Sequence, residues 1–119
     1  MIRRKDERLI EVKPNLKDGN GSVEFKYIAN SEEMFNKVKM FSTLTLNKGD
    51  SIGYHTHVGE AEIMYINKGK GLYKDDGQES VVNQGDVTIC FENHYHGIVN
   101  NDDEPLELIA MVLYKESRR

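Results

Sequence analysis

The chain has 119 residues, of which 38% are hydrophobic and 30% are charged, and its 20 acidic and 16 basic residues give a net charge of −4. This length and composition predict one globular domain over residues 1–119 and exclude a disordered chain. The negative net charge argues against a nucleic-acid-binding protein, and the lack of an apolar run of roughly 20 residues argues against a membrane span.

The N-terminal segment is charged, with the sequence MIRRKDERLIEVK, and it lacks the apolar core of a secretory signal. Because the lone Cys90 also excludes an intrachain disulfide, we expect a cytoplasmic protein. Residues 8–13 resemble a strand and are a candidate for pairing with a second copy of the chain. Residues 13–21 predict a mobile loop, and residues 31–37 are the only stretch of helical character, one or two turns long.

The rest of the chain alternates between apolar and polar residues with the period of a β-strand. The predicted strands cover residues 37–46, 51–57, 62–66, 71–74, 80–82, 87–91, 97–99 and 105–114. Segments rich in Gly, Asn and Asp separate these strands, as turns require. Many short strands with almost no helix predict a β-sandwich or a barrel.

All four histidines of the chain occur in two H-x-H pairs, His55 with His57 and His94 with His96. Side chains at i and i+2 of a strand lie on the same face, so each pair can direct two imidazoles toward one point. Imidazoles inside a barrel need partners for their nitrogens, and a divalent metal supplies them. The pairs therefore predict a metal site, although this spacing does not distinguish His96 from His94 as a ligand.

A carboxylate close to the first pair extends the candidate site. Strict alternation would place Glu62 on the opposite face from His57, so the residues between them must turn or bulge, and Gly59 permits this. Glu62 then returns to the interior, while Glu60 lies at the turn and is the weaker candidate. Several imidazoles with one carboxylate suit Mn, Fe, Co, Ni, Cu or Zn and are a poor ligand set for Ca or Mg.

This spacing resembles the two metal-site motifs of the cupin superfamily, whose members are small jelly-roll barrels. The first motif, G-x5-H-x-H-x4-E-x6-G, is matched at every fixed position, by Gly49, His55, His57, Glu62 and Gly69.

The second motif of the family, G-x5-P-x-G-x2-H-x3-N, is matched by Gly85, His96 and Asn100. The chain departs from it at Phe91, where the family usually has Pro, and at Asn93, where it has Gly. Asn tolerates a positive φ better than other non-glycine residues, so the second departure is mild.

The resemblance implies an all-β fold, a double-stranded β-helix or jelly-roll barrel, with motifs at residues 49–69 and 85–100 and a tendency to form homodimers. It also implies that the metal ligands are His55, His57, Glu62 and His96. His94 is then an exposed residue in the turn before the last ligand, and the alternatives are a replacement ligand or an acid/base group. Glu62 and His94 are the candidate catalytic residues, since Glu62 could also accept a proton.

Three neutral imidazoles and one carboxylate around a divalent ion leave a net charge of about +1, and a six-coordinate ion keeps two adjacent positions open. Such a site suits small bidentate oxygen anions: α-keto acids, α-hydroxy acids, oxalate-like diacids or enediols. The first hypothesis is an enzyme that oxidises, decarboxylates or isomerises a small organic acid or dicarbonyl compound. The second is a binding protein without chemistry, and the third is a metal that only stabilises the barrel.

Two further kinds of side chain bear on the barrel interior. Cys90 lies in a β-branched run and is expected to be a small buried apolar residue. Four tyrosines are expected in the pocket wall: Tyr54, Tyr65, Tyr73 and Tyr95.

Overall fold

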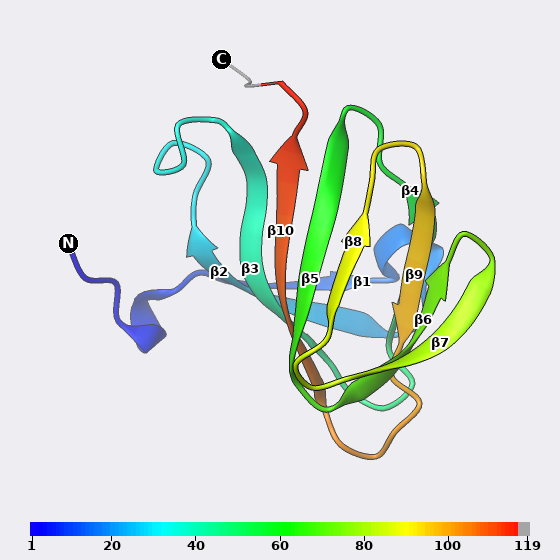
Figure 1. The fold of residues 1–119 in the computed structure, drawn as a ribbon. Coiled ribbons are helices and arrows are strands. Elements are labelled where there is room, and N and C mark those ends of the chain that lie inside the picture. Colours follow the sequence, from blue (N-terminus) through cyan, green and yellow to red (C-terminus); the bar gives the residue numbers. More distant parts are fainter. Residues whose placement is uncertain (117–119) are drawn as a thin grey trace.

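Ten strands form two antiparallel sheets in the computed structural model, which describes residues 1–116 (Figure 1). The six-stranded sheet has the order β1-β2-β3-β10-β5-β8, and the four-stranded sheet has the order β4-β9-β6-β7. The strands are β1 (Ile10–Pro14), β2 (Ser22–Ala29), β3 (Val38–Leu46), β4 (Ser51–Thr56), β5 (Glu60–Lys68), β6 (Lys70–Asp75), β7 (Gln78–Asn83), β8 (Val87–Cys90), β9 (Tyr95–Val99) and β10 (Leu106–Tyr114). The all-β prediction is therefore confirmed.

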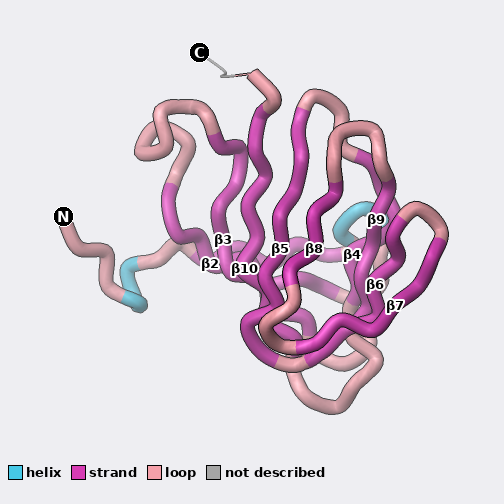
Figure 2. Tube along the Cα trace, in the orientation of Figure 1, coloured by secondary structure: helices cyan, strands magenta, loops and turns pink. Residues whose placement is uncertain are grey.

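Within the described residues, helical structure is limited to two short 3₁₀ turns, η1 (Lys5–Glu7) and η2 (Leu16–Asp18), drawn in cyan in Figure 2. Within residues 1–116 no helix is long and apolar enough to cross a bilayer.

The core lies between the two sheets and follows from the alternation of the strands. In β10, which pairs with both β3 and β5, the side chains of Leu106, Leu108 and Ala110 are 0% exposed. Burying one large aliphatic side chain contributes about 1.5–3 kcal/mol. Besides these three, the core cluster contains Val23, Phe25, Leu44, Leu46, Ile52, Met64, Ile66, Tyr73 and Ile98.

Strand β2 is an element that the sequence analysis missed. It pairs with β3 on one side and with β1 on the other, and it buries Val23 and Phe25 in the core. The alternation of Val23, Phe25 and Tyr27 was the available signal. Strand β1 contains most of the stretch expected to pair with a second copy, but it pairs within the chain, with Ile10 opposite Lys26.

The short helix predicted over residues 31–37 is wrong, because these residues form successive hydrogen-bonded turns. Phe35 and Asn36 both have φ of 56°, a left-handed conformation that a right-handed helix cannot continue. Before them, Asn30 and Glu33 exchange backbone-to-side-chain hydrogen bonds of 2.9 Å in both directions. The segment thus begins as a helix would, but the chain reverses within one turn.

The loop at residues 13–21, predicted to be mobile, is anchored against β4. The Asn20 carbonyl accepts a hydrogen bond of 2.9 Å from the Ser51 amide, and the Asn15 amide donates to the Gly21 carbonyl at 2.8 Å. The loop and the strand approach so closely that a Cβ at Gly53 would lie 1.9 Å from the Lys17 carbonyl oxygen. Gly53 therefore permits this contact, which fixes the loop beside the barrel interior.

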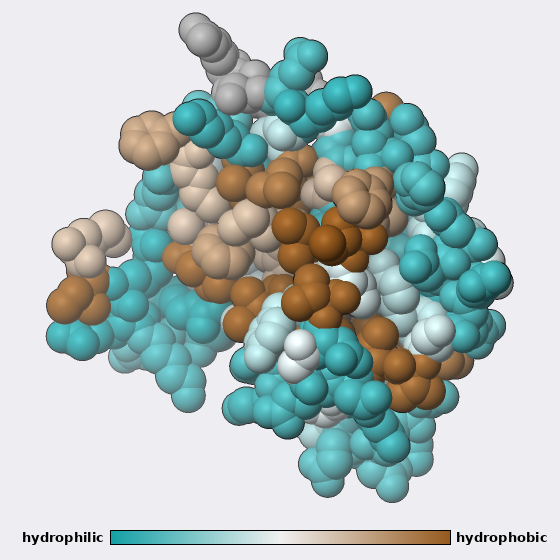
Figure 3. Space-filling view, viewed as in Figure 1, coloured by the Kyte–Doolittle hydropathy of each residue, from teal (hydrophilic) through white to brown (hydrophobic). Residues whose placement is uncertain are grey.

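The outward face of the six-stranded sheet is unusually apolar for a surface that faces solvent (Figure 3). The strand register places Phe41, Met111, Ile63 and Ile89 in one row across β3, β10, β5 and β8. We call this surface the outer apolar face; it comprises Phe41, Ile63, Tyr65, Val87, Ile89, Ile109 and Met111.

Candidate metal centre

Four side chains converge inside the barrel, and they are the four that the motif resemblance implies. His55 lies near the end of β4, His57 directly follows that strand, Glu62 lies on β5 and His96 lies on β9. One ligand atom from each residue lies within 4.8 Å of the others. His57 is 5% exposed, Glu62 6% and His96 1%, and His55 is partly buried. Both sheets therefore contribute to one buried cluster of three imidazoles and a carboxylate.

The turn that returns Glu62 to the interior occurs at Gly59, as the sequence predicted. Gly59 has φ of 71°, and its amide donates a 2.9 Å hydrogen bond to the Glu92 carboxylate. The carbonyl of His57 accepts a 2.8 Å hydrogen bond from the Asn93 amide. Asn93 itself has φ of 67°, so it adopts the left-handed conformation at a position where the family usually has Gly.

Each imidazole of the cluster is held from behind through its Nδ1 atom. Nδ1 lies 2.6 Å from the Gly53 carbonyl for His55, 2.9 Å from the Glu60 carboxylate for His57 and 2.9 Å from the Tyr73 hydroxyl for His96. An imidazole with its proton on Nδ1 donates to such an oxygen and leaves the lone pair of Nε2 free. The three rings are thus oriented as metal ligands require.

The distances within the cluster also fit a metal ion. Oε1 of Glu62 lies 3.2 Å from Nε2 of His57 and 3.0 Å from Nε2 of His96, and the two Nε2 atoms are 3.1 Å apart. Adjacent ligands about 2.1 Å from one ion lie about 3 Å from each other. Two imidazole lone pairs at this separation repel unless a cation or a proton lies between them, so the cluster is suited to a divalent transition metal.

The charge states of the metal-free cluster follow from burial and from these contacts. Burial lowers the pKa of His55 to about 4, so this imidazole is neutral at pH 7. Burial alone would lower the pKa of His57, but hydrogen bonds to Glu62 and Glu60 outweigh it and raise that pKa. Burial alone would raise the pKa of Glu62, but hydrogen bonds to His57 and His96 outweigh it and lower that pKa. Glu62 is therefore an anion at neutral pH.

Comparison with known proteins gives the family. Residues 42–112 match the cupin domain family. The chain is a cupin. It is 34% identical over 113 residues to the oxalate-binding protein of Thermotoga maritima, covering 95% of this chain and 93% of that protein.

Solved structures give the same result for the fold. A predicted oxalate decarboxylase from Thermotoga maritima has a TM-score of 0.91 and 34% identity, covering 96% of this chain and 99% of that one. KdgF from a Halomonas species has a TM-score of 0.73 at 18% identity, covering 100% of this chain and 96% of that one. At this identity the similarity supports the fold only. The predicted cupin jelly roll is therefore confirmed.

Two residues support the cluster of this cupin from outside the ligand set. Glu60 is hydrogen bonded to His57 through Oε1 and to Lys39 through Oε2, at 3.2 Å, so it joins the cluster to the pocket rim. Tyr73 is 4% exposed, and burial raises the pKa of its hydroxyl, which stays protonated beside His96. From the sequence, Glu60 was predicted at the turn and Tyr73 in the wall, and the contact of each with an imidazole was not predicted.

His94 lies outside the cluster, in contrast to His96. Its Nδ1 contacts the Asp76 carboxylate at 2.5 Å, and its side chain is 57% exposed. The structure therefore places His94 in the exposed turn before His96, as expected if it is neither a ligand nor an acid/base group.

The prediction that the four tyrosines line the pocket is wrong, because Tyr73 is buried in the core against Nδ1 of His96 and the other three lie at the surface. Tyr54 and Tyr95 stack on each other at the surface, with exposures of 44% and 45%, and Tyr65 lies on the outer apolar face. The prediction for Cys90 is confirmed, because this residue is buried and burial raises the pKa of its thiol to about 11.

The cluster opens into a pocket of about 180 Å³, which we call the metal pocket. The ammonium-bearing side chains of Lys13, Lys17 and Lys39 contribute to its wall, and Lys17 is placed there by the anchored loop. These three lysines outnumber the two acidic residues of the wall, Glu60 and Glu62, and a divalent metal held by the cluster would add positive charge, so the pocket favours an anionic ligand.

Proposed function

We propose that this cupin binds a divalent transition metal through His55, His57, Glu62 and His96 and uses it to oxidise, decarboxylate or isomerise a small organic acid or dicarbonyl compound. The observation that carries the proposal is the convergence of three imidazoles and one carboxylate, each imidazole being held through Nδ1. The metal, one of Mn, Fe, Co, Ni, Cu or Zn, supplies a Lewis acid for a bound oxygen anion.

The proposed ligand is a small oxygen anion. The metal pocket is small and bordered by lysines, and a relative with 34% identity is named an oxalate-binding protein. Glu62 is already hydrogen bonded to two imidazoles and has a lowered pKa, which suits a permanent ligand better than a proton acceptor.

The second candidate is a binding protein that holds the same anion without transforming it. The observation in its favour is that the acidic side chains in the wall of the metal pocket, Glu60 and Glu62, are both hydrogen bonded to histidines. Neither carboxylate is therefore free to act as a general base in this arrangement.

Metal-loaded protein incubated with oxalate, pyruvate and a panel of hydroxy acids and dicarbonyl compounds, with and without O₂, tests both candidates. Turnover supports the enzyme, whereas a tightly retained acid that is recovered unchanged by mass spectrometry supports the binding protein. A purified chain that binds none of the six metals overturns both.

Metal occupancy is expected to fall as the pH is lowered through about 6.5, because metal binding requires neutral imidazoles and protons compete for them. The pKa of His57 is raised, so this residue is protonated first, whereas the pKa of His55 is about 4. In the metal-free protein, low pH has the opposite effect, on the stability of the fold. The raised pKa of His57 stabilises the fold at low pH, and this contribution is lost as the pH rises through that pKa. Elemental analysis after dialysis between pH 8 and pH 5 measures the occupancy, and a flat profile contradicts the site.

Replacement of Tyr73 with Phe is expected to weaken metal binding about 10–100-fold, because His96 loses the hydroxyl that orients its ring. Competition with a chromophoric chelator measures the affinity. Tyr65→Phe, on the outer apolar face, is the matched control, and equal affinities in the two variants contradict a role for Tyr73.

We also propose that the chain forms a homodimer through the outer apolar face. Exposed apolar patches larger than a few hundred Å² mark interaction sites, and a face without charged side chains at its centre can pack on its own copy around a two-fold axis. Ile63→Lys, at the centre of this face, is expected to give a monomer in sedimentation analysis. Val81→Lys, at a 60% exposed position of the other sheet, leaves the dimer unchanged. A monomeric wild-type chain at high concentration contradicts the proposal.

We keep two further expectations as proposals: that residues 1–119 form a single cupin domain and that the protein works in the cytoplasm. The free Cys90 is compatible with a reducing compartment.

A further inference from the structure

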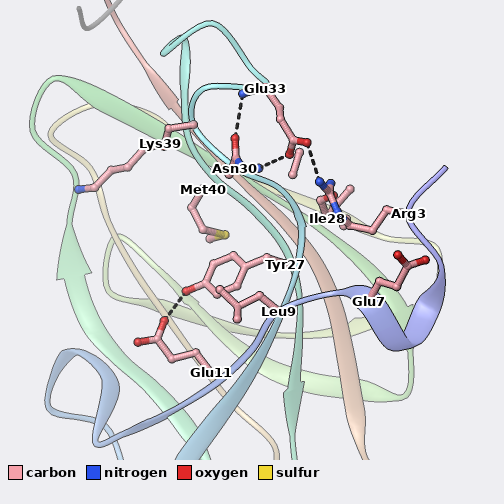
Figure 4. A pocket seen from close by; sticks show the side chains of 12 residues that line it. Arg3, Glu7, Leu9, Glu11, Tyr27, Ile28, Asn30, Glu33, Lys39 and Met40 are labelled. Atoms are coloured by element: carbon pink, nitrogen blue, oxygen red, sulfur yellow. Dashed lines mark hydrogen bonds and ion pairs between the residues drawn. The ribbon is translucent and has the colours of Figure 1, made fainter. Parts of the chain in front are cut away.

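A second and larger cavity lies beside the metal pocket, and the proposed function does not use it. It has a volume of about 410 Å³ and is bounded by the N-terminal segment, by the end of β2 and by the start of β3 (Figure 4). We call it the side compartment. It opens on the inner side of the six-stranded sheet, where Tyr27 and Met40 pack against the core.

The side compartment adjoins the metal pocket because Lys39 and Met40 line both cavities. Lys39 extends its ammonium group to Glu60, which is hydrogen bonded to the metal-cluster residue His57. The two cavities are therefore direct neighbours that meet at Lys39 and Met40.

The wall of the side compartment presents mainly apolar surface, supplied by Leu9, Tyr27, Ile28 and Met40 (Figure 4). Two of its polar side chains, Tyr27 and Glu11, are engaged with each other. Tyr27 donates a hydrogen bond of 2.6 Å to Glu11, and burial together with this bond raises the pKa of Tyr27 to about 12.

The charged groups at the far end of the side compartment are paired in the same way. The guanidinium of Arg3 binds Glu33 at 2.5 Å and the Ile28 carbonyl at 2.9 Å, and Glu33 also accepts a hydrogen bond from the Asn30 amide. A ligand in this compartment meets mainly apolar carbon, and the paired charges of Arg3 and Glu33 need no counter-ion from it.

We propose that the ligand of this cupin is a 2-oxo or 2-hydroxy acid with an alkyl or aryl body. Its oxygen-rich head binds in the metal pocket beside the lysines, and its body fills the side compartment. This inference rests on the proposed function and narrows its substrate class. Oxalate, which has no body, fills the metal pocket alone and leaves the apolar wall in contact with water.

Calorimetric titration of the metal-loaded protein with pyruvate and with phenylpyruvate tests the inference. The two acids share the same 2-oxo acid head, so a difference between their affinities measures the contribution of the body. Phenylpyruvate is expected to bind at least about tenfold more tightly, since its ring buries apolar surface against Leu9, Tyr27 and Met40.

Two variants test the position of the ring. Ala29 lines the side compartment and not the metal pocket, so Ala29→Trp fills the compartment and is expected to remove the preference for phenylpyruvate while the pyruvate affinity stays unchanged. Leu9 is 71% exposed, so Leu9→Glu leaves the core intact and is expected to weaken phenylpyruvate binding alone. Val81→Trp, on β7, is the control for an added indole.

Equal affinities for the two acids in the wild-type protein overturn the inference and leave the proposed function standing. A preference for phenylpyruvate that survives both variants also overturns it, because the ring then binds elsewhere. If Ala29→Trp changes the oligomeric state and affects both acids equally, the side compartment is a subunit contact and the inference fails. If neither acid binds to metal-loaded protein, the proposed function fails as well.

Discussion

Replacing His96 with alanine is expected to abolish metal retention, whereas replacing His94 with alanine leaves the metal content unchanged. His96 is 1% exposed, and its Nε2 lies 3.0 Å from Glu62 within the cluster. His94 is two residues away in the chain, but it points to Asp76 at the surface. Loss of one of four ligands is expected to weaken binding more than about 100-fold, beyond the 10–100-fold effect of residues that only orient a ligand.

Elemental analysis after exhaustive dialysis measures this contrast, and circular dichroism shows whether both variants are folded. The pair is a matched control, because the same substitution is made twice on the same short segment. Metal retained by H96A, or lost from a folded H94A, contradicts the four-ligand site.

Replacing Asn100 with alanine is expected to lower the free energy of unfolding by about 2–4 kcal/mol. Asn100 is 0% exposed, and its side-chain amide donates hydrogen bonds of 2.9 Å to the carbonyls of Leu46 and Glu104. Its side-chain oxygen accepts a third bond, from the Asp102 amide. Alanine removes all three at once and leaves buried polar groups without these partners.

Urea unfolding measures the change, and Asn101→Ala is the neighbouring control. Asn101 is exposed, so its substitution is expected to change stability by no more than about 0.5 kcal/mol. Asn100 does not contact the metal cluster, so folded N100A retains its metal. Equal stability of the two variants would show that the last residue of the second motif has no structural role.

Much of the fold was predictable because alternation along a strand is a local property. The runs from residue 37 onwards were predicted close to their observed bounds, and the strand predicted at residues 105–114 contains all of β10. The region before residue 37 was described less well. Strand β2 alternates as clearly as the others but was overlooked, and the residues 31–37 carry helix-forming Glu and Met side chains that cannot outweigh two left-handed residues.

The candidate site was predictable to the level of its residues, but its supports were not. Spacing alone could not separate His96 from His94, because the distinction depends on the pairing of β4 with β9, which sets His96 opposite His55. The contact of Tyr73 with His96 depends on how β6 pairs with β9. Such long-range pairings are not encoded in the local pattern of either strand.

Gly53 links the metal centre to a distant part of the chain. The carbonyl of Gly53 orients His55, while its missing side chain lets the loop at residues 13–21 rest on β4. Docking of this loop and binding of the ion therefore depend on the same backbone segment, so their free energies are coupled. By reciprocity, an occupied centre protects the loop from local unfolding, and a change in the loop alters affinity for the ion without touching a ligand.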